Sequence, residues 1–315
     1  MYINSVGYYI PKTRIDNNYF TELNGLTSDW IQQRTGILSR SRASEIETMD
    51  YMCIEAVKNA MVQLPYRLKE IDLIVFASYT PSDIIANSAY IIQKEFHIDK
   101  AKVLMVSSAC SSGVNGIEII DAFIATKKAS KALLICADRN STYSNEEDPQ
   151  SGHLWGDAAV AYFFSDNKYG HKDVKLVDLI SYGLGHIGHG PQGVYLNPLD
   201  GGLQMPYGKD VFINACTYMT SITREIVERN DCLISDIDYF IGHQANQRIL
   251  KNVAKQLEIP EEKVLSNIEE LGNTGSVGSL LVFAQNYDRY EIEDLICLSV
   301  FGGGYSVGSC LFEIV

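Results

Sequence analysis

The sequence has no long hydrophobic run and no excess of basic residues. No stretch of its 315 residues approaches 18 uninterrupted apolar residues, and the opening MYINSVGYYIPKTR lacks the basic head and apolar run of an export signal. We therefore expect neither a membrane span nor secretion. Only 26 basic residues stand against 39 acidic ones, and a net charge of −13 repels a phosphate backbone, so nucleic acid is not an expected partner.

The sequence also lacks any C-x-x-C pair among its seven cysteines. Because seven is odd, at least one thiol stays free however the others pair, and a reducing cytoplasm fits this pattern best. Six of the cysteines lie within helical or strand patterns and are expected in the core, namely Cys53, Cys136, Cys216, Cys232, Cys297 and Cys310.

The composition is that of a globular chain, with 46% apolar and 21% charged residues. At roughly 150 residues per domain, its length fits two domains or one large two-part unit. The polar segment SDNKYGHK separates two stretches of similar pattern. We therefore predict two α/β halves, residues 1–167 and 168–315, related by an internal duplication around one shared site.

Short β-branched runs alternate with segments of helical period, which is typical of βα units. Val114, Ile117, Ile120 and Ile124 recur at spacings of three and four, so they predict a helix that begins soon after Ser111. The sequence predicts buried strands at 71–78, 102–108, 131–138, 158–164 and 237–243, with two more strands closing the chain on either side of a glycine-rich turn at 302–304.

Cys110 lies where a predicted strand meets this helix. A helix N-terminus favours a thiolate, so we expect a lowered pKa and a nucleophilic sulfur. Its small neighbours, Ala109, Ser111, Ser112 and Gly113, leave room for a substrate. The alternative is a packed, half-buried structural thiol, because free cysteine is among the most buried residue types.

Two polar residues occupy similar positions in the second half. His243 follows the apolar run DYFIG and precedes a helix, at the end of a strand where open α/β sheets place their sites. Asn273 lies in the glycine-rich segment ELGNTGSVGS, where its amide is able to donate hydrogen bonds. Taken singly, each is also explained by ordinary turn chemistry.

Four motifs occur in order along the chain, namely SSACSSG, IGHQANQRI, LGNTGSVGS and VFGGGYSVGS. Together they resemble the β-ketoacyl-acyl carrier protein synthase III family of the thiolase superfamily. TSDWIQQRTGI and WGDAAVAYFF resemble further segments of that family, so the resemblance spans nearly the whole chain. It implies a five-layered αβαβα sandwich of two duplicated halves, and a cytoplasmic homodimer joined across the strand that contains residues 103–107.

The resemblance implies a decarboxylative Claisen condensation of fatty acid biosynthesis or a related pathway. Cys110 would carry the acyl group of a primer thioester, commonly an acyl-coenzyme A, while His243 and Asn273 stabilise the enolate formed from malonyl-acyl carrier protein. The N–H groups of Cys110 and Gly303 would form an oxyanion hole for acyl transfer, and Phe301 would pack against the malonyl group. No metal and no cofactor beyond these substrates is implied.

The same resemblance assigns binding residues. Trp30 and Arg34, four residues apart on one helical face, would hold the nucleotide end of coenzyme A. Asn246 would hydrogen-bond the pantetheine arm. Arg248, with Lys251 and Lys255 on the same helix, forms a basic stripe that fits an acidic carrier protein, although a solvated helix face is the alternative.

The chain departs from the family pattern at three places. EEDPQSGHLWGD has no arginine where many members carry one against the adenine of coenzyme A, so coenzyme A is less certain as the acyl donor. Ile213 stands where many members have a lysine that faces the carrier protein, and Ser111 and Ser112 replace a small apolar pair. These departures suggest a specialised paralogue with an unusual acyl pocket.

Two rival functions remain at this point. One is an acyltransferase or thioesterase that never decarboxylates malonyl groups, and Asn273 argues against it, because thioester transfer alone needs no second donor. The other is a non-catalytic partner subunit, against which the combination of Cys110, His243 and Asn273 argues. His186 and His189 lack a third ligand at recognisable spacing, so a metal site is not expected there.

Overall fold

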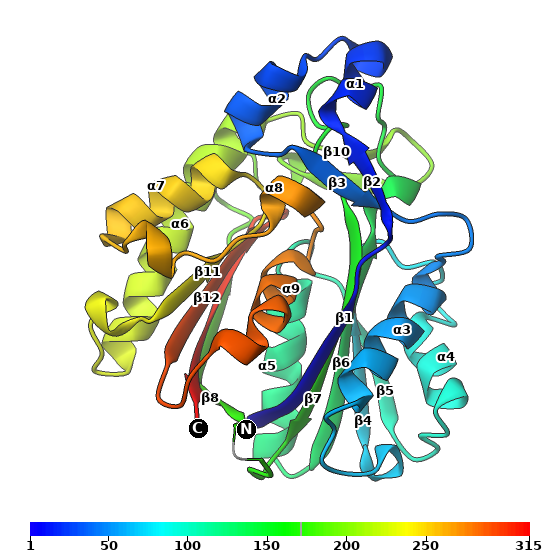
Figure 1. The fold of residues 1–315 in the computed structure, drawn as a ribbon, viewed down its shortest axis with the longest axis vertical. Helices are drawn as coiled ribbons and strands as arrows, with labels where there is room; N and C mark the ends of the chain where they lie inside the picture. Colours follow the sequence, from blue (N-terminus) through cyan, green and yellow to red (C-terminus); the bar gives the residue numbers. More distant parts are fainter. Residues whose placement is uncertain (171) are drawn as a thin grey trace.

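The computed structural model describes residues 1–170 and 172–315. Its main feature is a nine-stranded mixed sheet in the order β11-β12-β13-β8-β1-β7-β6-β4-β5 (Figure 1). Five strands come from the first half of the chain: β1 (Tyr2–Tyr9), β4 (Leu73–Ala77), β5 (Lys102–Val106), β6 (Lys131–Arg139) and β7 (Asp157–Ser165). Four come from the second half: β8 (Val174–Gly183), β11 (Tyr239–Gly242), β12 (Leu295–Gly302) and β13 (Ser306–Ile314).

The strand order repeats between the two halves. In β1-β7-β6-β4-β5 the first two pairings are antiparallel and the last two parallel, and β8-β13-β12-β11 follows the same scheme. The place that corresponds to β5 is taken by Val264, which forms a single parallel bridge with Phe240. The division at residues 167 and 168 stays a prediction, and His171 of the predicted boundary segment lies outside the described residues.

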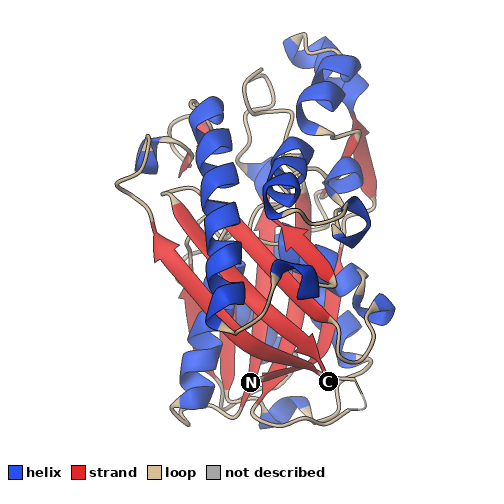
Figure 2. Cartoon of the chain, turned by 90° about the vertical axis from the view of Figure 1, so that its left-hand side faces the viewer, coloured by secondary structure: helices blue, strands red, loops and turns tan. Residues whose placement is uncertain are grey.

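Helices form three layers around the two half-sheets. The central layer is α5 (Ser112–Ala125) with α9 (Gly278–Gln285), and both helices contact strands of both halves. The first half-sheet is covered outside by α3 (Met49–Met61) and α4 (Ser88–Glu95), and the second by α6 (Gly208–Arg229) and α7 (Gln247–Leu257). Figure 1 shows this succession of layers from side to side, and Figure 2 shows helices lying in front of the strands, which confirms the expected αβαβα sandwich.

The core follows the same layers. One apolar cluster fills the centre, a second lies beneath α3 and α4, and a third beneath α6 and α7. As predicted, Val114, Ile117, Ile120 and Ile124 form the buried face of α5. The predicted strands are confirmed to within two residues at either end, because long apolar runs between polar turns mark them clearly.

A cap of short elements covers one end of the sheet, shown at the top of Figure 1. It comprises β2 (Thr13–Asp16), α1 (Asn17–Asn24), α2 (Ser28–Thr35), β3 (Ser39–Arg42), β9 (Tyr195–Asn197), β10 (Gly202–Gln204) and α8 (Ile268–Leu271). The two chain termini lie side by side at the opposite end (Figures 1 and 2). Among the described residues, no helix combines the length and apolarity that crossing a membrane requires.

Candidate active site

Cys110 lies in a tight turn between β5 and α5. Ala109 adopts the left-handed conformation with φ of 50°, which is unfavourable for a residue with a side chain. Ser112 stabilises the turn, since its hydroxyl accepts from the Ser108 N–H (2.8 Å) and donates to the Ala109 carbonyl (2.6 Å). The turn places Cys110 two residues before the first residue of α5, with only 8% of its surface exposed.

The lowered pKa expected for Cys110 is wrong. Burial raises the pKa of this thiol to about 12, and the nearby carboxylate of Asp138 adds to the increase. Hydrogen bonds from the backbone N–H groups of Gly303 and of Cys110 itself act in the opposite direction without cancelling the effect of burial. The resting residue is therefore a protonated thiol, because the loss of water outweighs the influence of the helix end.

The glycine-rich turn between β12 and β13 approaches the nucleophile closely. A Cβ atom on Gly302 would lie 3.0 Å from the backbone nitrogens of both Cys110 and Ser111, so only glycine fits without displacing the turn. The Ser306 hydroxyl lies 2.6 Å from that of Ser111 and joins the two turns. The N–H groups of Cys110 and Gly303 lie near enough to the Cys110 sulfur to lower its pKa, and the oxyanion hole assigned to them stays a prediction.

His243 follows directly after β11 and is 4% exposed. Burial lowers the pKa of its imidazole to about 4, so the ring is neutral near pH 7 and carries one N–H donor. Its buried Nδ1 has no hydrogen-bond partner among the described residues.

Hydrogen bonds to its backbone and to its side-chain oxygen hold Asn273 and leave one group of its side chain free. Its backbone N–H donates to the Leu154 carbonyl (2.8 Å), and its carbonyl accepts from the Gly156 N–H (2.9 Å). Its Oδ1 accepts from the Gly275 N–H (3.0 Å). The Nδ2 group makes no hydrogen bond within residues 1–170 and 172–315, so it is available as a donor to a substrate.

Cys110 and Asn273 each line a hollow, and His243 is among the lining residues of neither. Cys110 lines a cavity of about 250 Å³ together with Tyr79, Trp155 and residues of the 194–203 segment. Asn273 lines a larger cleft of about 570 Å³. Leu154 lines the cleft and the next residue, Trp155, lines the cavity and forms a strand bridge with Asn273, so the same segment borders both.

The large cleft is lined by the binding residues that the resemblance assigns. Trp30 and Arg34 share one face of α2, with the guanidinium carbon 5.4 Å from the centre of the indole ring. Asn246 caps α7 by accepting from the Arg248 N–H (2.8 Å), and its Nδ2 donates to the Arg34 carbonyl (3.1 Å). The structure therefore brings Trp30, Arg34, Asn246, Arg248 and Asn273 to one cleft.

The structure shows where the other assigned residues lie but does not test the roles assigned to them. Phe301 is 2% exposed and packs against Tyr305, with ring centres 5.0 Å apart, in the apolar cluster beneath α6. Its contact with a malonyl group stays a prediction. The proximity of His243 and Asn273 to the Cys110 sulfur also stays a prediction.

The remaining cysteines require one correction. All seven thiols are free, and five of the six expected core cysteines are buried. Cys232 is only partly buried, because it lies in the turn after α6 rather than in a helix or strand.

Across residues 1–170 and 172–315, no cluster of three or more histidine, cysteine or carboxylate side chains is arranged to hold a metal. His189 instead stacks on Tyr207, with the ring centres 3.6 Å apart.

Sequence reasoning missed two features of the site. His153 lies edge-on to Trp30, with ring centres 5.6 Å apart, and occupies the wall of the cleft. Asp138, at the end of β6, is fully buried and receives hydrogen bonds from two loops of the site. Its only sequence signal is a charged residue at the end of an apolar strand, which does not show what surrounds it.

Comparisons with known proteins indicate the same family for both halves of the chain. Family models described as 3-oxoacyl-(acyl-carrier-protein (ACP)) synthase III and its C-terminal part match residues 105–183 and 227–314. A protein of Ehrlichia canis named beta-ketoacyl-(acyl-carrier-protein) synthase III is 31% identical over 99% of this chain and 98% of its own length. One from Wolbachia pipientis of Culex pipiens is 32% identical with the same coverage.

Solved structures show the same similarity. The 3-oxoacyl-(acyl-carrier-protein) synthase III of Aquifex aeolicus superposes with a TM-score of 0.91 at 29% identity, covering 99% of both chains. The priming beta-ketosynthase of the R1128 polyketide biosynthetic pathway gives 0.89 at 25% identity, covering 99% of this chain and 95% of that one.

Proposed function

Because this chain belongs to the beta-ketoacyl-acyl-carrier-protein synthase III family, we propose that it condenses a primer acyl thioester with malonyl-acyl carrier protein through an acyl-enzyme on Cys110. The observation that carries the proposal is the position of this thiol. It lies in a cavity, at a turn where Gly302 closely approaches the backbone nitrogens of Cys110 and Ser111. The product is a 3-oxoacyl-acyl carrier protein.

In the first half-reaction, the Cys110 sulfur attacks the carbonyl carbon of the primer thioester. The carbon–sulfur bond to the donor breaks, and the thiol proton of Cys110 passes to the departing sulfur, so that a free thiol leaves. The N–H groups of Cys110 and Gly303 support the oxyanion of the tetrahedral intermediate. The acyl chain enters the cavity lined by Tyr79 and Trp155.

In the second half-reaction, malonyl-acyl carrier protein loses carbon dioxide, and the electron pair of the broken bond forms an enolate. The enolate carbon attacks the acyl carbon on Cys110, and the sulfur leaves and regains a proton from the solvent. Neutral His243 and the free Nδ2 of Asn273 are suited to donate to the enolate oxygen. This pair of uncharged donors favours decarboxylation over the plain acyltransferase alternative.

The two half-reactions are expected to separate by mutation. Asn273→Ala should still form an acyl-enzyme but lose condensation by on the order of a hundredfold or more, the usual effect of removing one oxyanion donor. Cys110→Ala should form no acyl-enzyme yet still permit malonyl decarboxylation. Intact mass spectrometry follows the acyl group, and release of labelled carbon dioxide follows decarboxylation. If Asn273→Ala condenses at the wild-type rate, the plain acyltransferase replaces this proposal.

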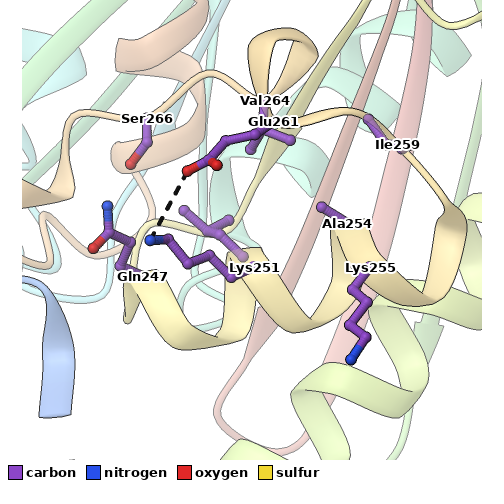
Figure 3. A pocket seen from close by; sticks show the side chains of 9 residues that line it. Gln247, Lys251, Ala254, Lys255, Ile259, Glu261, Val264 and Ser266 are labelled. Carbon is purple, nitrogen blue, oxygen red and sulfur yellow. Dashed lines mark ion pairs between the residues drawn. The ribbon is translucent and has the colours of Figure 1, made fainter. Parts of the chain in front are cut away.

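The proposed carrier-protein dock is the exposed face of α7. Figure 3 shows Lys251 directed toward Glu261, whereas Lys255 points away from that carboxylate. All three residues line a groove of about 320 Å³. The Lys251–Glu261 pair is 3.9 Å apart. Within residues 1–170 and 172–315, neither Arg248 nor Lys255 forms an ion pair, so both are available to an acidic partner on this chain of net charge −13.

Charge reversal tests this dock. Lys255→Glu should raise KM for malonyl-acyl carrier protein severalfold, because it opposes an acidic partner, and should leave acylation by a small acyl-pantetheine thioester unchanged. Lys251→Ala should have a smaller effect, since Glu261 already offsets that charge. Lys69→Glu, an exposed lysine far from α7 in the sequence and beside β4, is the matched control. Equal KM values for Lys255→Glu and Lys69→Glu would refute the dock.

We further propose acyl-coenzyme A as one primer donor and a homodimer in the cytoplasm. The aromatic and cationic pair of Trp30 and Arg34 at the cleft supports a nucleotide-bearing donor. The free edge of β5, with half-exposed apolar residues from Val103 to Val106, supports pairing with a second copy.

A further inference from the structure

Asp138 is a buried carboxylate that the two half-reactions do not use directly. It is fully inaccessible to solvent at the end of β6, between the two halves of the site. Its Oδ1 accepts hydrogen bonds from Ser78 Oγ (3.1 Å), the Tyr79 N–H (3.1 Å), the Thr80 N–H (3.3 Å) and Thr80 Oγ1 (2.9 Å). Its Oδ2 accepts from the N–H (2.8 Å) and Oγ (2.6 Å) of Ser276.

Each oxygen of this carboxylate therefore holds a different loop. The Oδ1 loop follows β4 and contains Tyr79, which lines the Cys110 cavity. The Oδ2 loop is the glycine-rich turn that begins at Asn273. The two loops also meet directly, since a Cβ atom on Gly275 would come within 3 Å of both the Tyr79 hydroxyl and Asp138.

The next residues of the chain reinforce this link. Asn140 accepts from the Tyr79 hydroxyl (2.6 Å), and its Nδ2 donates to the Gly156 carbonyl (2.7 Å) and more weakly to the Asn273 carbonyl (3.4 Å). The end of β6 thus contacts both the wall of the acyl cavity and the backbone of the decarboxylation donor.

We propose that Asp138 is a positioning residue that fixes the acyl-cavity wall at Tyr79 and the donor turn at Asn273 relative to one another, one carboxylate oxygen serving each loop. A buried carboxylate without a paired cation is costly unless hydrogen-bond donors surround it, and here six donors do so. An amide at this position cannot replace it, because its NH2 group would face donors of one loop. The assignment of each loop to a half-reaction rests on the proposed function.

Two serine variants separate the loops. Ser276→Ala removes one donor to Oδ2, and we expect condensation to fall about tenfold while acylation of Cys110 stays near the wild-type rate. Ser78→Ala removes one donor to Oδ1, and we expect slower acylation or an altered preference for primer chain length, with malonyl decarboxylation unchanged. Asp138→Asn should impair both half-reactions.

Ser309→Ala is the matched structural control. This buried serine hydrogen-bonds Ser299 inside the second half-sheet, so its loss should lower thermal stability without changing the ratio of the two half-reactions. If Ser276→Ala and Ser78→Ala lower both half-reactions in equal proportion, or change neither, the positioning role is refuted. The serine variants decide the matter even if Asp138→Asn does not fold. If the serine variants refute the positioning role while Asn273→Ala still separates the half-reactions, the proposed function remains intact.

Discussion

At the scale of single residues, the protonation states of the site come from burial rather than from local sequence. Cys110 lies at a helix N-terminus, which the sequence predicts correctly, yet its pKa is raised because the thiol is buried and Asp138 lies nearby. The motif around the cysteine shows neither how deeply the thiol is buried nor that Asp138, 28 positions away, lies near it. The proposed acylation would therefore start from a protonated thiol that loses its proton as the donor sulfur departs.

This protonation state predicts the pH dependence of Cys110 alkylation. With a thiol pKa of about 12, the rate of carbamidomethylation by iodoacetamide should keep rising with pH and show no plateau up to about pH 9. Intact mass spectrometry measures the rate, and Cys110→Ala corrects for reaction at the partly buried Cys232. A plateau below about pH 8 would show that the thiol is activated in the resting protein.

At the scale of elements, Asn246 joins two helices that both line the cleft. Its Oδ1 caps α7, and its Nδ2 holds the C-terminal end of α2 through the Arg34 carbonyl. The residue assigned to the pantetheine arm thus also sets the position of Trp30 and Arg34. A cap of this kind is expected to contribute both to stability and to the shape of the cleft.

Replacement of Asn246 separates these two contributions. Asn246→Ala should lower the free energy of unfolding by about 1 kcal/mol, through loss of the cap, and raise KM for the primer donor. Asn246→Ser keeps a capping oxygen but loses the contact with Arg34, so it should raise KM with little change in stability. Urea titration and steady-state kinetics measure the two effects. A stability loss as large for serine as for alanine would contradict the capping role.

The elements differ in how far the sequence reveals them. Long apolar strands such as β6 and β7 are predicted well, because all or nearly all of their length is buried. The strands of the cap are only three or four residues long, too short for an alternating pattern to mark them, so the sequence does not predict β2, β3, β9 and β10. Two of these short strands, β9 and β10, line the Cys110 cavity, and the cleft depends on residues distant in sequence, such as His153 beside Trp30.

At the scale of the whole molecule, buried histidines link stability to pH. Burial, with a smaller contribution from Arg40, lowers the pKa of His153 from 6.5 to about 4. Between these two values the unfolded chain binds more protons than the folded one, so the free energy of unfolding falls as pH is lowered from about 6.5 to about 4. Asp138 acts in the opposite sense, because burial raises its pKa to about 6.

Comparison with His153→Gln isolates the histidine contribution. On going from about pH 7 to about pH 5, wild type should lose roughly 2 kcal/mol more unfolding free energy than the variant, at about 1.4 kcal/mol per pKa unit. The contribution of Asp138 is common to both proteins and cancels. Urea titrations at the two pH values measure this difference, and equal losses in both proteins would show that His153 is not held neutral.

The two ends of the nine-stranded sheet are unequal, and this inequality bears on assembly. The β5 end is a free edge, while the β11 end is blunted by the single Val264 bridge and by the Leu265 N–H, which donates to the Phe240 carbonyl. If two copies join edge to edge through β5, each outer margin of the combined sheet is a β11 end. In the proposed homodimer, these blunted margins would offer few free backbone groups to a further copy, so association would stop at a closed pair instead of propagating into a fibre.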